Sequence, residues 1–224
     1  FEVPALAPGE SWVKRLNPLL SRRIVTERSL EATAAARLEI GEELVAEVDR
    51  AITIYDYHVF NWRDPSKVAV FVDSNDAAVK AFVDSAWEHR PEVSRYEFPP
   101  ARMVTAVTLL SGLKEHQLGY KPDAQTSVSV APGTEATDRV NYPGETLLRR
   151  SGDCDDIVVL CCSVLEAADI PTAVVVAPSH VIMMFDSGLS AIPASSSRGP
   201  GGLFCEESWV AHKGRLWIPV EATE

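Results

Sequence analysis

The chain has 224 residues, of which 46% are hydrophobic and 24% charged, with a formal net charge of −11. This length and apolar content allow one large domain, or one medium and one small, with a buried core. The acidic balance, with basic residues clustered only in pairs such as Arg22-Arg23 and Arg149-Arg150, argues against nucleic acid or an anionic membrane surface as the main partner. The longest apolar runs are strand-sized, so no membrane span is expected.

The chain begins with Phe1, and neither a basic segment nor an apolar signal-peptide segment precedes it. The expectation is a part of a longer polypeptide, with any targeting signal outside this chain.

Residues 1–62 are predicted to form an antiparallel, sandwich-like β region. Strand-like segments are expected at 12–16, 24–26, 30–40 and 44–59, and the alternation in Ile52-Thr53-Ile54-Tyr55 is typical of a half-buried strand. Gly41-Glu42 is the expected hairpin turn between the last two strands.

Residues 63–224 are predicted to form a second domain of α+β class. Helices are expected within 75–118, capped by Ser74 or Asn75 and interrupted near Pro99-Pro100, and at 154–168. Strands are expected between 172 and 221. A short helix over 143–150 precedes the second long helix, and the Gly- and Ser-rich run at 195–202 is typical of a loop.

One segment places a cysteine where an apolar helix begins. It reads Gly152-Asp153-Cys154-Asp155-Asp156. Apolar residues then recur at three- and four-residue steps, which predicts a helix with one buried face, capped by Asp153. The helix dipole favours a thiolate at Cys154, whereas Asp155 and Asp156 oppose it. A protonated histidine nearby would offset the negative charge of these two aspartates. The alternative is that Cys154 is a small core residue, which is the commoner role of a cysteine.

The other cysteines favour packing roles. Cys161 and Cys162 lie on the same predicted helix as Cys154 and are too far along it to form a disulfide with Cys154. A disulfide between the adjacent residues Cys161 and Cys162 would need a strained ring. Only Cys205 could therefore form a disulfide with one of the three. Zinc-type C-x-x-C spacing is absent. Cys161 and Cys162 are therefore predicted to fill the core.

A catalytic thiol needs a base, and one histidine is distinctive. His58, His89, His116 and His212 fall in predicted surface or turn contexts, whereas His180 opens an otherwise apolar strand. Such a strand is expected to be central and buried. His180 is then either a core residue or a histidine held beside a partner.

The group that could orient His180 is narrowed by strand geometry. Asp186 lies six residues along the same strand, roughly 20 Å away, and is excluded. Glu221 follows a strand in which Leu216, Ile218 and Val220 share one face, so a neighbouring strand could bring it to the imidazole. From spacing alone, an exposed edge-strand glutamate is the commoner outcome.

Several motifs occur in an order that resembles the bacterial branch of the transglutaminase-like superfamily. The resemblance covers about residues 75 to 224 and rests on the segments Tyr142-Pro143-Gly144-Glu145, Gly152-Asp153-Cys154-Asp155-Asp156, Ile170-Pro171-Thr172-Ala173, Pro178-Ser179-His180 and Trp217-Ile218-Pro219-Val220-Glu221.

The resemblance implies a papain-like α+β fold in which Cys154 is the nucleophile, His180 the general base and acid, and Glu221 the orienting carboxylate. Glutamate stands where the family usually has aspartate, and the insertion at 188–207 is expected to form a lid or substrate wall. The backbone N–H of Cys154 is one oxyanion donor, and Tyr142 and Tyr120 are further candidates.

The expected function is acyl transfer through a thioester on a peptide or protein substrate, with hydrolysis as in a cysteine protease or amidase. Two alternatives stay open: transamidation of protein glutamine, and a non-catalytic peptide-binding module. No cofactor or metal is expected, because successive helical carboxylates point in different directions. The compartment stays open, with export to a bacterial periplasm suggested by the family.

Overall fold

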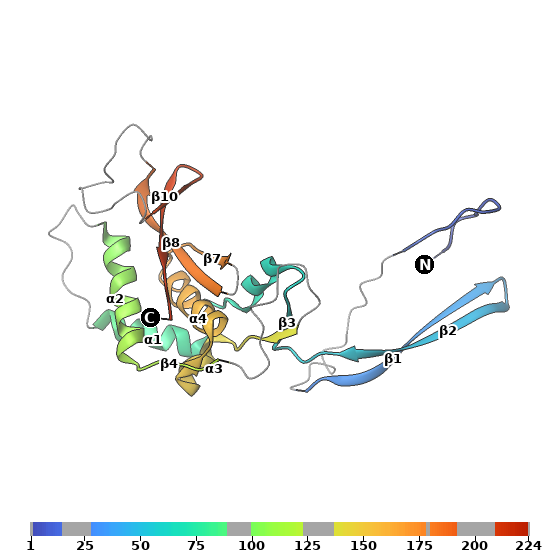
Figure 1. Cartoon of the computed structure of the whole chain (residues 1–224), viewed down its shortest axis with the longest axis horizontal. Helices are drawn as coiled ribbons and strands as arrows, with labels where there is room; N and C mark the ends of the chain where they lie inside the picture. Colours follow the sequence, from blue (N-terminus) through green and yellow to red (C-terminus); the bar gives the residue numbers. More distant parts are fainter. Residues whose placement is uncertain are drawn as a thin grey trace. The chain divides into compact units, whose positions relative to one another are not determined.

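The computed structural model describes residues 2–14, 28–88, 100–122, 137–177, 180–191 and 209–223. The chain divides into two compact units, 1–57 and 58–224. Their combination of helices and strands confirms the α+β class (Figure 1). None of the helices in the described ranges is long and apolar enough to cross a membrane.

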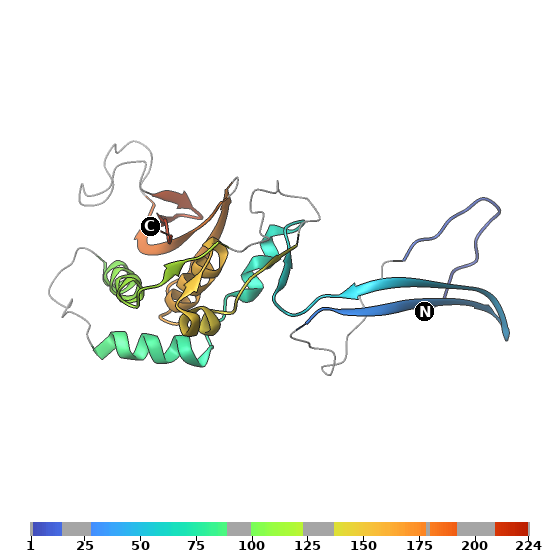
Figure 2. The ribbon, with the colours of Figure 1, turned by 60° about the horizontal axis from the view of Figure 1, so that its bottom comes forward.

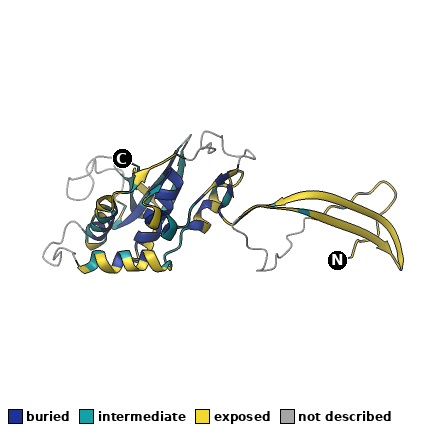
Figure 3. Ribbon diagram, turned by 90° about the horizontal axis from the view of Figure 1, so that it is seen from below, coloured by how far each residue is buried: buried dark blue, intermediate teal, exposed yellow. Residues whose placement is uncertain are grey.

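The first unit contains a single long hairpin in its described part. Strands β1 (Leu30–Ile40) and β2 (Glu43–Ile54) pair antiparallel around the expected turn at Gly41, whose φ is +64°. Nearly every residue of the two strands is exposed, as the yellow ribbon of Figure 3 shows. The antiparallel pairing agrees with the prediction for this region. The described residues form one two-stranded ladder, however, and not the predicted sandwich-like arrangement of two packed sheets.

Two further strand predictions for this region need correction. Residues 12–14 have no regular structure, and residues 15–16 and 24–26 lie outside the described part. The expected strand over 44–59 ends at Ile54, and a separate strand, β3 (Val59–Asn61), pairs with β5 (Thr137–Arg139) of the second unit. The unit boundary therefore precedes β3 and does not fall at residue 62.

The second unit packs helices against a four-stranded antiparallel sheet. The strand order is β7 (Thr172–Ala177), β8 (His180–Ser190), β10 (Arg215–Val220) and β9 (Val210–His212). Burial alternates along the start of β8, with Val181, Met183 and Phe185 buried. Strand β8 is thus central, as predicted from its apolar sequence.

Helix α4 (Cys154–Glu166) lies at the centre of this unit. It contacts β7 and β8 on one side, and α1 (Ala77–Glu88), α2 (Ala101–Glu115) and α3 (Pro143–Arg149) elsewhere (Figure 2). Every residue from Cys154 to Leu165 is buried. The prediction of one buried face is wrong because neighbouring elements cover the helix on all sides, so even its polar side chains are enclosed.

The remaining short elements connect this core. A 3-10 helix spans Pro65–Phe71, and the parallel pair of β4 (Gly119–Tyr120) and β6 (Ser151–Gly152) leads the chain to the start of α4. The cap of α1 is Asp76, whose Oδ1 accepts from the N–H groups of Ala78 and Val79, not Ser74 or Asn75.

Candidate functional site

The start of α4 is built by a local hydrogen bond that the sequence predicted. Asp153 is the N-cap, in an extended conformation, and its carboxylate accepts from the backbone N–H of Asp156 at 3.5 Å. Cys154 is consequently the first helical residue, and its side chain is buried with 4% exposure. This geometry directs the positive end of the helix dipole toward the thiol.

Asp156 ties this turn to the start of α3. Its two carboxylate oxygens accept from the backbone N–H of Asn141 at 2.6 Å and from the side-chain amide of Asn141 at 2.5 Å. A Cβ added to Gly152 would lie 2.5 Å from the Cβ of Asp156. Glycine is therefore required at 152 by a close approach, and Asp156 holds the turn before α3 against the start of α4.

The surroundings of the thiol oppose its ionisation. Burial, followed by the charges of Asp155 and Asp153, raises the pKa of Cys154 to about 12, although hydrogen bonds from the backbone N–H groups of Val181 and Asp155 lower it in part. The largest opposing charges are thus those of Asp155, as predicted, and of Asp153, which was predicted only as a cap. At neutral pH the ground state of Cys154 is a thiol, so attack requires proton transfer to a base.

Three buried carboxyl groups, two of them from residues on either side of Cys154 in the chain, lie close together. One oxygen each of Asp138, Asp153 and Asp155 lies within 4.8 Å of the others. Among the described residues, Asp155 Oδ2 has no hydrogen-bond donor. Burial, then interaction with Asp153, raises the pKa of Asp155 well above its usual range. A protonated Asp155 can donate to Asp153, and the same three oxygens are of the type that binds hard cations.

Asp138 was not predicted as a neighbour of this cluster. It comes from β5, which precedes α3 in the chain, and its Oδ2 accepts from the indole N–H of Trp62 at 2.8 Å. A metal site was not expected from the sequence, because carboxylates on successive helical residues point in different directions. That reason does not apply to Asp138, which lies on β5. The β3–β5 pairing holds Asp138 opposite Phe60, and the hydrogen bonds of Asn141 to Asp156 hold the following residues against the start of α4.

His180 and Glu221 are in direct contact. Imidazole Nε2 lies 2.6 Å from Glu221 Oε2, and both side chains are one-third exposed. The other carboxylate oxygen accepts from the N–H and the hydroxyl of Thr223, at 3.1 and 2.6 Å. Burial would raise the pKa of Glu221, but the hydrogen bonds from Thr223 and His180 outweigh it, so the pKa is lowered. Glu221 is therefore a fixed, ionised partner for the imidazole.

Strand pairing explains how this contact arises. Strand β10 runs antiparallel beside β8, with Val220 opposite Met183, so the residues after Val220 pass the start of β8. The excluded residue Asp186 lies farther along β8, where its Oδ2 accepts from Arg102 at 2.8 Å and from Arg215 at 3.2 Å. The thiol of Cys154 contacts the backbone N–H of Val181, the residue after His180. The His180–Glu221 contact and the thiol of Cys154 thus both lie near the start of β8.

Tyr120 is the tyrosine that approaches this site. Burial, and then the electrostatic effect of Cys154 in the alkaline range, raise the pKa of its phenol; Asp153, Asp155 and Glu221 act in the same direction. The β4–β6 pairing places Tyr120 beside Gly152, two residues before the thiol. Its phenol is half exposed, at 53% for the residue, and can donate to a bound group.

Tyr142, the other candidate oxyanion donor, has a structural role instead. It is the N-cap residue of α3, where its backbone N–H donates to Glu145 Oε2 at 3.3 Å, and the centroid of its ring lies 5.3 Å from that of Phe71. His58, expected in a surface or turn context, lies in a turn but is buried, and its Nε2 lies 2.8 Å from Glu145 Oε2. These residues position α3, whereas His116 and His212 are exposed as predicted and His89 lies outside the described residues.

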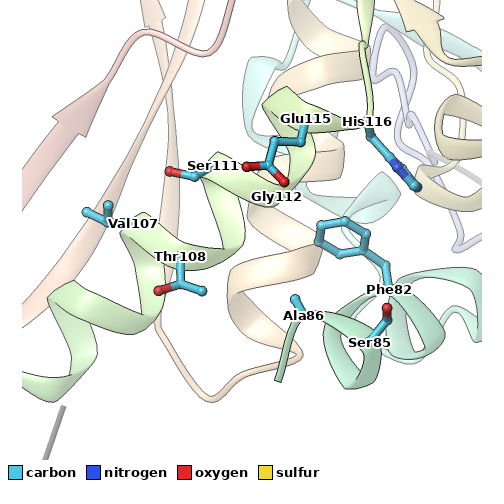
Figure 4. A pocket seen from close by; sticks show the side chains of 9 residues that line it. All are labelled: Phe82, Ser85, Ala86, Val107, Thr108, Ser111, Gly112, Glu115 and His116. Carbon is cyan, nitrogen blue, oxygen red and sulfur yellow. The ribbon is translucent and has the colours of Figure 1, made fainter. Parts of the chain in front are cut away.

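Two hollows flank helix α2. One, of about 600 Å³, opens beside Tyr120 and Glu221 and is lined mainly by apolar side chains of α2, α4, β8 and β10. The other, of about 620 Å³, lies between α1 and α2 (Figure 4), where Thr108, Glu115 and His116 face Phe82 and Ser85. Only the first contains residues of the candidate site.

The buried cysteines behave as predicted. Cys161 and Cys162 are free thiols within α4, and burial raises the pKa of each to about 12. Cys205 and most of the predicted insertion at 188–207 lie outside the described residues; its first residues continue β8 to Ser190.

Comparison with family models, curated proteins and solved structures gave no match to this chain.

Proposed function

We propose that the chain is a cysteine-nucleophile acyl-transfer enzyme of the transglutaminase-like, papain-like type that acts on peptide or amide bonds. The observation that carries the proposal is the 2.6 Å contact between His180 and Glu221 beside a helix whose first residue is Cys154. A base held by a carboxylate next to a thiol at a helix start is the arrangement that nucleophilic catalysis requires.

The proposed reaction begins with a neutral thiol. His180 accepts the proton of Cys154 as the sulfur attacks the carbonyl carbon, and Glu221 stabilises the imidazolium that forms. The backbone N–H of Cys154 and the phenol of Tyr120 donate to the resulting oxyanion. As the C–N bond breaks, His180 gives its proton to the leaving amine, and a thioester remains on Cys154.

Water then resolves the thioester. His180 takes a proton from the water, which attacks the carbonyl carbon, and the C–S bond breaks to release a carboxylic acid and the thiol. Attack by a lysine amine in place of water would give transamidation. We favour hydrolysis because the site is partly open, with His180 and Glu221 each one-third exposed, and transamidation requires exclusion of water.

A non-catalytic peptide-binding module is the second candidate. One observation favours it: the surroundings of Cys154 raise its thiol pKa to about 12, which leaves the sulfur unreactive unless His180 accepts its proton. Such a module would bind a peptide in the hollow beside Glu221 and would not cleave it.

A paired assay tests the proposal. Wild-type protein and Cys154→Ala are compared for cleavage of a peptide mixture and for incorporation of a labelled amine into a glutamine-containing donor. Cleavage that disappears in Cys154→Ala supports hydrolysis, and amine incorporation that disappears supports transamidation.

Alkylation by iodoacetamide near neutral pH provides the second arm. We expect Cys154 to react faster than glutathione. Reaction no faster than glutathione, together with no activity lost in Cys154→Ala, would refute the enzymatic proposal and leave the binding module.

A further inference from the structure

The apolar hollow between α2 and the sheet, here called the α2 cavity, is continuous with the candidate site along one face of α4. Ile157 and Cys161 line it, and they follow Cys154 by three and seven residues. Residues at this spacing share a helix face, with neighbouring Cβ atoms about 5–6 Å apart. The cavity therefore begins about one helical turn from the sulfur.

The composition of the walls indicates what the cavity can bind. Its polar side chains include Tyr120, Glu221 and Thr223, which belong to the catalytic end, and Ser111 and Lys114 on α2. The remainder is mainly apolar: Met103, Leu110, Leu113, Phe185, Ile218 and Val220. A volume of about 600 Å³ exceeds the needs of a single methyl group and is in the range of pockets that enclose small organic ligands.

The sheet explains why this wall is apolar. Phe185 and Ile218 are directly opposite each other on β8 and β10, so their side chains share the sheet face that looks toward α4. Helix α2 contacts both α4 and β8. The cavity is thus bounded by regular elements, which hold its shape before a ligand arrives.

We propose that the α2 cavity is the specificity pocket for the acyl side of the substrate, and that it accepts a large aliphatic or aromatic group attached close to the carbonyl that Cys154 attacks. This inference rests on the proposed function and names its substrate class. An apolar group is required because burial of each methylene is favourable, whereas a charged group would lose hydration among these side chains.

Alkylation with a homologous pair of reagents tests the pocket separately from catalysis. N-methyl- and N-hexyl-2-chloroacetamide both form an S–C bond to Cys154 with loss of chloride, and the thiol proton passes to buffer. The rate with the methyl reagent, relative to glutathione, reports activation of the thiol and so tests the proposed function. The hexyl-to-methyl rate ratio, divided by the same ratio for glutathione, reports the cavity.

We expect this normalised ratio to reach at least about tenfold, since a fully buried methylene contributes about two- to fourfold in binding. A ratio within twofold of that for glutathione would overturn the inference, even if the methyl reagent showed an activated thiol. Peptide mapping must place the hexyl group on Cys154; modification of Cys161 instead would also overturn it, because the cavity would then not lead to the nucleophile.

Two variants on one helix sharpen the result. Leu110→Trp fills the α2 cavity and should reduce the ratio to that of glutathione, whereas Thr108→Trp adds the same side chain to the hollow between α1 and α2 (Figure 4) and should not change it. Should Leu110→Trp fail to fold, protection of wild-type Cys154 by N-methylheptanamide, whose long chain is on the acyl side, but not by N-methylacetamide, gives the same decision. Equal protection by both amides contradicts the pocket.

Discussion

Glu221 Oε2 lies 2.6 Å from His180 Nε2, while its other oxygen accepts two hydrogen bonds from Thr223. The carboxylate is therefore held on both sides, and the tautomer of His180 with a proton on Nε2 is favoured. That tautomer leaves Nδ1 as the basic nitrogen.

Replacement of Glu221 by glutamine should lower kcat about 10²- to 10⁴-fold, because the amide neither stabilises an imidazolium nor fixes this tautomer. KM should change little. The measurement is steady-state kinetics on the substrate found in the paired assay. Glu166→Gln is the matched control, since Glu166 also accepts a short hydrogen bond, from Thr172, but at the far end of α4. Equal losses in the two variants would contradict the orienting role.

Tyr120→Phe should lower kcat about 10- to 10³-fold without loss of folding stability, because the phenol is proposed to donate only to the oxyanion that forms during attack. Tyr55→Phe is the control, because Tyr55 is 56% exposed and Tyr120 is 53% exposed. Kinetics and thermal melts of both variants decide the matter. If Tyr120→Phe retains full kcat, the oxyanion donor is not this phenol.

The raised pKa of Asp155 should make the stability of the folded protein depend on pH. Its pKa is raised in the folded protein, so its contribution to the free energy of unfolding is fully present below its unfolded pKa and is lost as pH rises through the folded value. Asp155→Asn resembles the protonated carboxyl and should remove this loss. Urea unfolding from about pH 4 to about pH 8 should show a wild-type decline that the variant lacks. Asp84→Asn, on the exposed face of α1, should retain the decline.

Gly152→Ala should destabilise the second unit by about 1–3 kcal/mol, because the new Cβ would overlap Asp156 and disturb its bonds to Asn141. Gly119→Ala is the control on the partner strand, since its Cβ would lie 3.7 Å from the nearest atom, the carbonyl oxygen of Arg150. The test is chemical denaturation of both variants. Equal stability of the two would show that the approach of Gly152 to Asp156 relaxes at no cost.

Local sequence determined the elements that carry the site. The Asp153 cap, the helix that begins at Cys154 and the strand that begins at His180 were all predictable, because capping and periodic burial depend on residues close together in the chain. The same reasoning missed the burial of His58 and the extent of burial of α4. Exposure of a polar residue depends on what packs over it, which no short pattern records.

The sequence by itself determined which residues could act, a thiol at a helix start, a histidine in an apolar strand and a glutamate after another strand. Tertiary structure decided how they are combined. The register of β10 on β8 brings Glu221 to His180, the β4–β6 pair brings Tyr120 toward Cys154, and the β3–β5 pair holds Asp138, whose carboxyl lies beside those of Asp153 and Asp155. Each is a pairing between segments distant in sequence, whose register depends on the packing of the whole core.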